Sequence, residues 1–258
     1  MNRSHRISAA VILAGLASLP ALAQEAAPAA APAPAAAPAE ANPWKFKLSA
    51  AFAGSDNDNT SNWNLRFAGE AKQATETNVT TLGAEYFFQT SDGDETDNNL
   101  KLRGLEEWLF KDSKWELFAE AIYQNDEFAD WEQRIGLYAG PAYRLVEKEN
   151  YKLKVRAGAG ASYEFPTSDW TPELLVGESL EWKINDRSKL VHALDVFPDL
   201  DETSEYRLVV SAEYQVDLDS SKSLVGNLGV RNEYDSYIES TGDSSNDFKI
   251  YAGISAEF

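Results

Sequence analysis

The chain of 258 residues contains no cysteine, and its 42 acidic residues outnumber 23 basic ones, which gives a formal net charge of −19. The lack of cysteine excludes a disulfide-stabilised scaffold, so stability must come from a large core or from closure of a sheet. The acidic excess argues against nucleic acid as a partner and against adhesion to anionic lipid headgroups.

The N-terminus has the pattern of a secretory signal peptide. Arg3 and Arg6 supply the positive start, and residues 7–19 form an apolar stretch that is too short to span a bilayer. Cleavage after Ala23 would follow a small-x-small motif. We therefore predict that residues 1–23 direct export and are removed.

A stretch of unusual composition follows the predicted cleavage site. Residues 24–43 consist almost wholly of Ala, Pro and Glu, and the repeated prolines disfavour a helix and favour extended chain. Because this stretch has no apolar face to bury, we predict a disordered periplasmic linker. The remaining residues, 44–258, suit one all-β domain.

Apolar and polar residues alternate along this domain in segments whose length, roughly ten residues, is typical of tilted transmembrane strands. Successive side chains of a strand point to opposite faces, so each segment has one apolar and one polar face. In chain order, the expected strands cover residues 44–53, 62–68, 81–88, 99–110, 115–124, 134–145, 152–163, 176–184, 189–197, 206–216, 224–234 and 246–258.

Three segments are irregular. In residues 99–110, Leu105 lies on the polar parity, which indicates either a bulge or an apolar plug inside the barrel. Pro141 lacks the N–H that a paired strand requires, and Glu178 lies on an apolar parity. The segment 189–197 is apolar on both parities, so its orientation stays open.

The connections alternate between tight turns, at residues 111–114, 147–150 and 185–188, and longer loops, at residues 91–98, 125–132, 166–171, 198–205 and 235–246. Short periplasmic turns and longer outer loops have this rhythm in outer-membrane barrels. With an even number of strands, both ends of the domain fall on the periplasmic side.

The last strand ends on an aromatic residue. Phe248, Ile250 and Ile254 share one face with the terminal Phe258. The final strands of bacterial outer-membrane barrels resemble this one, and their terminal Phe is an assembly signal. We expect Phe258 to have that role and to lie in the periplasmic aromatic girdle.

Aromatic residues lie near the segment ends, as interfacial girdles require. They include Trp44, Trp63, Trp108, Trp115, Trp182, Tyr86, Tyr123, Tyr143, Tyr163 and Tyr214. A soluble periplasmic β-sandwich that binds a ligand would show the same alternation with the opposite face buried. Strand length, loop rhythm and the two termini together favour an all-β, antiparallel up-and-down transmembrane β-barrel of about twelve strands in the bacterial outer membrane.

Four short motifs resemble a known family. They are Trp44-Lys45-Phe46, residues 59–62, the Gly-rich residues 136–143 and residues 250–254. The chain is similar in these to the salt-induced outer-membrane proteins, a family of uncharacterised function, although Asp58 stands where the family usually carries Gly. The resemblance implies an outer-membrane location and a stress-related role, and it supplies no catalytic residues.

Catalytic chemistry finds little support in the sequence. The exported chain has one histidine, His192, with no serine marked beside it by sequence context, so we read it as an interfacial or packed residue and expect no enzyme. Asp56-Asn57-Asp58 lacks the Gly and closing Glu of a calcium loop. We expect no cofactor and no dedicated metal site, although the acidic loops could bridge weakly through divalent cations to each other or to lipopolysaccharide.

Charged residues of both signs lie on the inward parity. The candidates for lining the lumen are Arg66, Glu120, Arg134, Arg144, Arg156, Arg207, Glu213, Arg231 and Lys249. If the basic side chains pair with carboxylates such as Glu120 and Glu213, the lumen is plugged; if they do not, it forms a narrow anion-preferring pore for small solutes. Without the strand register both readings stay open.

The expected partners follow from the barrel interpretation. They are outer-membrane lipid, lipopolysaccharide and the barrel assembly machinery, with no nucleic acid, and the chain is expected to be a monomer. The expected role is structural or stress-related in the cell envelope, with the pore as an alternative.

Overall fold

The computed structural model describes residues 44–56, 61–129, 131–236 and 246–258. The predicted signal peptide and linker lie outside these residues. The described chain forms β1 (Trp44–Asp56), β2 (Ser61–Ala74), β3 (Asn78–Ser91), β4 (Asp94–Leu109), β5 (Trp115–Asp126), β6 (Gln133–Glu147), β7 (Tyr151–Glu164), β8 (Asp169–Asn185), β9 (Ser188–Pro198), β10 (Tyr206–Asp217), β11 (Leu224–Asp235) and β12 (Asn246–Glu257).

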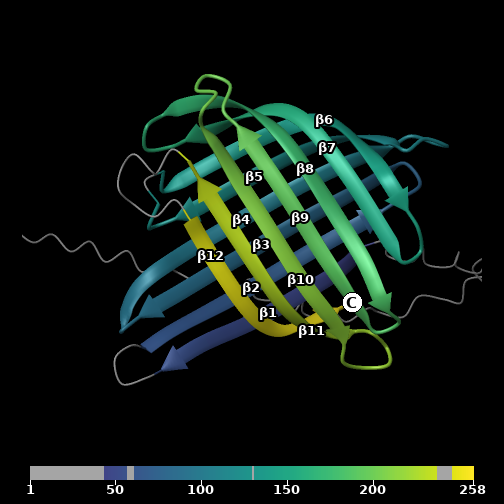
Figure 1. Cartoon of the computed structure of the whole chain (residues 1–258), viewed down its shortest axis with the longest axis horizontal. Helices are drawn as coiled ribbons and strands as arrows, with labels where there is room; N and C mark the ends of the chain where they lie inside the picture. Colours follow the sequence, from purple (N-terminus) through teal and green to yellow (C-terminus); the bar gives the residue numbers. More distant parts are fainter. Residues whose placement is uncertain (1–43, 57–60, 130, 237–245) are drawn as a thin grey trace, which may run out of the picture. The chain divides into compact units, whose positions relative to one another are not determined.

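Each strand pairs antiparallel with its neighbours in the sequence, and β12 pairs with β1 to close a barrel (Figure 1). Ala50 of β1 lies opposite Ile254 of β12, and the backbones of Phe46 and Phe258 exchange two hydrogen bonds of 2.9 and 3.1 Å. Closure leaves no unpaired sheet edge. The predicted up-and-down barrel of twelve strands is confirmed, and the sandwich alternative is wrong.

The apolar parity of the strands faces outward. Leu48, Leu228 and Ile250 are each more than half exposed, whereas Glu116 and Arg134 are buried inside the ring. A soluble sheet protein has the opposite arrangement, because burial of apolar surface drives its folding in water. An outer surface of this kind is suited to contact with lipid chains.

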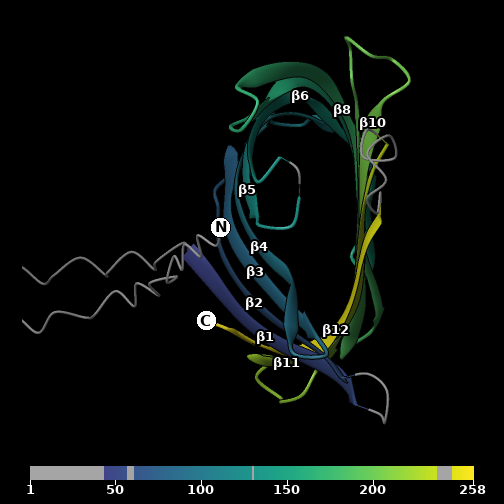
Figure 2. The ribbon, with the colours of Figure 1, turned by 90° about the vertical axis from the view of Figure 1, so that its left-hand side faces the viewer.

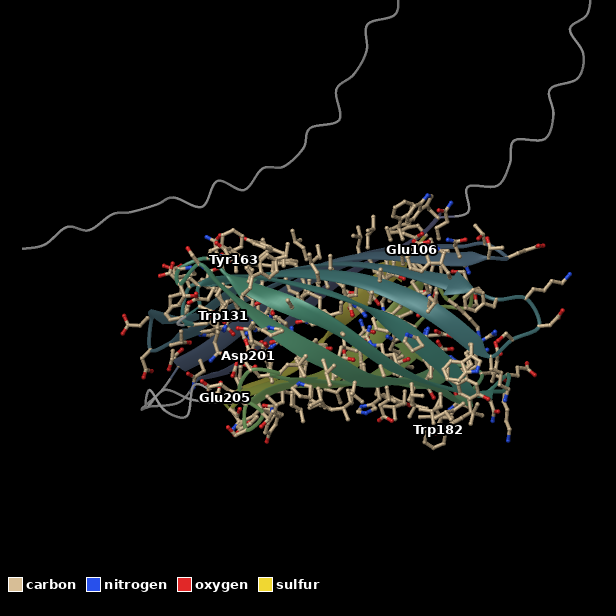
Figure 3. The ribbon with its side chains drawn as sticks, turned by 90° about the horizontal axis from the view of Figure 1, so that it is seen from above. Glu106, Trp131, Tyr163, Trp182, Asp201 and Glu205 are labelled. Carbon is tan, nitrogen blue, oxygen red and sulfur yellow. The ribbon has the colours of Figure 1, made fainter. Side chains whose placement is uncertain are left out.

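Aromatic residues mark both rims of this apolar surface. The end of the barrel that carries Trp44 and Phe258 is called the terminal end, and the opposite one the loop end. Figure 3 shows Trp182 at the terminal end and Tyr163 at the loop end. The ring of Tyr163 packs on that of Trp170 with centroids 5.0 Å apart, and Trp115 packs on Tyr143 at 4.9 Å. The predicted girdles are thus present at both rims.

The connection between β3 and β4 is shorter than predicted. Residues 91–98 were expected to form a loop, but β3 and β4 continue to a tight turn at Asp92 and Gly93. Both residues have positive φ, 54° and 90°. A two-residue Asp-Gly turn of this conformation matches the twist of a hairpin and lets both strands continue to its edge.

Two further connections depart from the expected rhythm. β8 begins at Asp169 instead of residue 176, which shortens the preceding loop. The longest turn at the terminal end joins β10 to β11, where the Asp219 carboxylate accepts hydrogen bonds from the Ser221 hydroxyl and the Leu224 N–H. These hydrogen bonds lower the pKa of Asp219 to about 2.

The irregular segments also have structural explanations. Leu105 points inward and packs against the apolar cluster of the lumen, so the plug interpretation of β4 is right. Pro141 interrupts the β6–β7 ladder, where paired residues pass from Ala139 directly to Ala142. Among residues of the described chain, no helix is long and apolar enough to cross a membrane.

Candidate functional site

The lumen is filled on one side by an apolar cluster. Phe118, Ile122, Tyr138, Leu175 and Phe197 come from β5, β6, β8 and β9 and are almost fully buried. Inward-facing glycines leave space for these rings. At Gly158, for example, a Cβ atom would lie 2.9 Å from the Phe118 ring. The edge of the Phe118 ring therefore occupies the space that a side chain at residue 158 would take.

The loop end of the lumen is narrowed by a residue that lies outside the strands. Trp131, in the segment between β5 and β6, is 8% exposed and packs on the Arg134 guanidinium at 4.3 Å. Figure 2 shows this segment inside the ring of strands. Arg134 also donates to Glu233 at 3.1 Å and to Gln124 at 3.2 Å. These contacts bridge β5, β6 and β11 across the opening.

A second group of ion pairs crosses the middle of the lumen near β3. Glu85 accepts from Arg66 through one carboxylate oxygen and from Arg231 at 2.7 Å through the other. Arg231 also donates to Glu233 at 2.9 Å, and Arg66 stacks on the Tyr251 ring at 4.3 Å. Glu85 therefore binds an arginine with each oxygen, and β11 is tied across the lumen to the neighbouring strands β2 and β3.

A third group lies between β5 and β9. The side chain of Glu120 has no exposed surface and accepts from both Arg103 and Arg156, the latter at 2.6 Å. Arg156 donates to Asp195 at 2.8 Å as well. A carboxylate removed from water in this way is tolerated only with compensating cationic partners.

The Arg207 guanidinium connects the polar network to the apolar cluster. It lies 4.0 Å from the centre of the Phe197 ring and donates to the Tyr138 hydroxyl at 3.2 Å. Tyr138 in turn donates to Glu173, whose carboxylate is 3.5 Å from Arg207. The cluster and the ion pairs therefore form one continuous filling.

The remaining predicted lumen residues lie nearer the rims or the β12 wall. Arg144 pairs with Glu116 at 3.0 Å, at the terminal end. Glu213 is 3.6 Å from Lys47 and accepts from Tyr251 at 3.0 Å, so its cationic partner is a lysine. Lys249 lies 2.7 Å from Asp97 and 2.5 Å from Asp247.

The filling leaves a cavity inside the barrel. It has a volume of about 370 Å³ and is lined by β1–β5 and β9–β12, with Ile122 and Phe197 of the apolar cluster on its wall. Its charged lining comprises Lys47, Arg66, Lys101, Arg103, Arg207 and Arg231 with Glu70, Glu85, Glu120, Asp195 and Glu213. Basic groups thus slightly outnumber carboxylates around this space.

All nine residues proposed from the sequence lie on the inner wall, and each has at least one ion-pair partner. Sequence reasoning missed Lys101, Arg103, Asp195 and Trp131. Lys101 and Arg103 alternate with Leu100 and Leu102, a signal that was available. Asp195 lies on the strand that is apolar on both parities, and Trp131 lies on a loop without periodicity.

The outward face carries few ionisable groups. Glu178 and His192 lie on the outer parity of β8 and β9, and the His192 ring is 3.2 Å from the Glu178 carboxylate. Near the terminal rim Glu106 accepts from Asn78 at 2.7 Å and from Thr80 at 2.6 Å. Both of these outward carboxylates thus have a local partner.

Among the described ranges, no three His, Cys, Asp or Glu side chains are grouped so that they could hold a metal ion. Part of the acidic first loop, including Asp58, lies outside these ranges.

A family model described as "Protein of unknown function, DUF481" matches residues 50–258. A search of curated proteins finds no match to the chain. Among solved structures, the translocator domain of the autotransporter NalP from Neisseria meningitidis is similar at 12% identity and a TM-score of 0.47, with 85% of this chain and 90% of that chain covered.

Two other solved structures have a similar chain path. The NanC porin is 9% identical, with a TM-score of 0.49 and 83% and 98% of the two chains covered. The COG4313 outer membrane channel from Pseudomonas putida F1 is 10% identical, with a TM-score of 0.48 and 88% and 100% covered. These likenesses concern the fold alone.

Proposed function

The chain belongs to DUF481, and we propose that it is a non-enzymatic protein of the bacterial outer membrane whose filled barrel has a structural role in the cell envelope. The proposal rests on the contrast between the outer and the inner surface of the barrel wall. The outer wall is apolar between aromatic girdles, while the inner wall is held together by ion pairs.

The outer surface supports the location. Exposed aliphatic side chains between two aromatic rims match the polarity of a bilayer. In this orientation the terminal end faces the periplasm, and the loop end, with Trp131 and Asp201, faces outward (Figure 3). The partners would be outer-membrane lipid and lipopolysaccharide, and the barrel would work as a monomer.

The inner surface supports the structural role. Ion pairs link strands across the lumen in several places, and the apolar cluster fills one side. Such a filling stiffens a barrel and removes a wide aqueous path. The resemblance to salt-induced outer-membrane proteins agrees with a role under envelope stress.

A narrow anion-preferring pore is the second candidate. The observation in its favour is the cavity, whose lining holds more basic than acidic side chains. Charges that line a constriction dominate selectivity, so conduction through this space would favour anions. The contacts of Trp131 and Arg134 at the loop end oppose conduction in the closed arrangement.

Cell fractionation with heat-modifiable gel migration tests the proposed location. We expect the protein in the outer-membrane fraction, with a folded band that shifts on boiling because a closed barrel resists detergent at room temperature. Release of the protein with the soluble periplasmic fraction would contradict the proposal.

Deletion of Phe258 should sharply lower the amount of inserted barrel in the same fractionation. Phe258 is 74% exposed, and its backbone also bonds to Phe46 at the seam. Phe258→Ala keeps those backbone bonds and removes the ring, so it should reproduce the loss if the assembly machinery reads the side chain.

Phe46→Ala is the matched control, because Phe46 lies at the same end and is 44% exposed. It should leave insertion near the wild-type level. Normal insertion of Phe258→Ala would show that the ring is not the signal.

A further inference from the structure

One lysine on the wall of the lumenal cavity forms no close ion pair with the described part of the chain. Lys101 lies on the inner face of β4, and no described carboxylate comes within 4.0 Å of its ammonium group. It also makes no hydrogen bond to any described residue. The other cavity-lining Lys and Arg residues each have at least one carboxylate partner.

The carboxylates nearest to Lys101 in the network are already used. Glu85 lies directly opposite Lys101 in the β3–β4 register, but its two oxygens accept from Arg66 and Arg231. Glu233 receives Arg134 on one oxygen and Arg231 on the other. In the structure both carboxylates point their oxygens at these arginines, and neither comes within 4.0 Å of the Lys101 ammonium group.

Other positive charges surround the same space. Arg103 follows Lys101 on the same face of β4, and its side chain is 37% exposed although it donates to Glu120. Arg231 and Arg66 line the cavity as well. An ammonium group that is partly removed from water, with three donors to satisfy, gains from an acceptor of opposite charge.

We propose that the lumenal cavity binds a small inorganic anion, of the class that includes chloride and phosphate, at Lys101. The anion would accept from the Lys101 ammonium group and lie close to Arg103. A cavity of about 370 Å³ has room for such an ion with part of its hydration shell. The site would stabilise the folded barrel whether or not the barrel conducts.

Thermodynamic linkage provides the test, because a ligand that binds only the folded state raises stability with its concentration. The full barrel, folded in a non-ionic detergent, is unfolded in urea at increasing chloride, with ionic strength held constant by gluconate as the reference anion. The folded fraction is read from heat-modifiable gel migration. We expect the unfolding midpoint to rise with chloride, and inorganic phosphate to have the same effect.

Lys101→Met should abolish the chloride dependence, and in anion-poor buffer its midpoint should equal or exceed that of the wild type, because an uncompensated charge has been removed. Lys152→Met is the matched control: Lys152 is 56% exposed at the terminal rim and lies 4.0 Å from Glu181. It should keep the full response to chloride.

Two outcomes would overturn the proposal: a wild-type midpoint that does not respond to either anion, or an equal response in Lys101→Met. Chloride-35 NMR gives a second measurement. The folded wild-type barrel should broaden the chloride resonance, and phosphate should reverse this broadening because it displaces the bound chloride. If Lys101→Met does not fold, Lys101→Gln takes its place, and absence of wild-type broadening still refutes the site.

Discussion

Glu120→Gln should lower the free energy of unfolding of the barrel by about 3–5 kcal/mol, because removal of one partner leaves buried charges without compensation. The Glu120 side chain has no exposed surface, and it is held between Arg103 and Arg156. Arg156 keeps Asp195 as a partner, whereas Arg103 loses its one carboxylate among the described residues. Urea unfolding followed by heat-modifiable migration measures the change.

Glu181→Gln is the matched control, since it removes the same charge from the exposed Lys152–Glu181 pair, 4.0 Å apart at the terminal rim. Exposed pairs contribute about 0–1 kcal/mol, so this variant should be close to wild type. Equal effects of the two variants would mean that the lumen is as well hydrated as the rim, and the account of a filled barrel would fail.

Ala50→Arg should also destabilise the inserted barrel, by about 2–4 kcal/mol if residue 50 lies near the bilayer midplane. Ala50 is exposed on the outward face of β1, between the rim residue Phe46 and Phe52. An arginine there must lose its hydration in the lipid or distort the bilayer to keep it.

Ser49→Arg provides the comparison on the adjacent residue of the same strand. Ser49 faces the lumenal cavity, where carboxylates such as Glu213 are available to a new guanidinium. We expect a smaller loss than for Ala50→Arg, measured in lipid vesicles by the same unfolding assay. A larger loss for Ser49→Arg would show that the assignment of the two faces is reversed.

The strand pattern was predictable because it depends on short-range alternation. The pairing of β12 with β1 leaves no separate signal in the sequence. It does explain why the alternation of apolar and polar residues continues through the last strand, because that strand is part of the barrel wall. The sequence also showed that Glu178 lies on the apolar parity of its strand. In the structure this carboxylate has His192 on the next strand as a partner. Turn positions were less secure: the Asp92-Gly93 turn was present in the sequence and was overlooked.

The contents of the lumen were only partly predictable. Alternation shows which side chains face inward, but pairing depends on register and on distances across the ring. Arg231 and Glu85 meet although 146 positions separate them in the chain. Only the structure could show that the oxygens of Glu85 point at Arg66 and Arg231 and that the described carboxylates lie more than 4.0 Å from the Lys101 ammonium group.

The glycines of β6 and β7 illustrate the same limit. The sequence shows that Gly158 faces the lumen, which would suggest tolerance of a larger side chain. In the structure, a Cβ there would lie 2.7 Å from the Ala139 carbonyl oxygen and would also meet Phe118. Packing inside the barrel, which has no periodic signature, decides the outcome at this position.

Planar-bilayer recording of the folded wild-type barrel under a salt gradient tests the central claim most directly, with dye-labelled protein to count the inserted molecules. A lumen closed by Trp131, the Arg134–Glu233 contact and the apolar cluster predicts repeated insertions without conductance steps. Stable steps at every insertion would contradict the filled structural barrel, and a reversal potential on the anion side would then establish the narrow anion-preferring pore in its place.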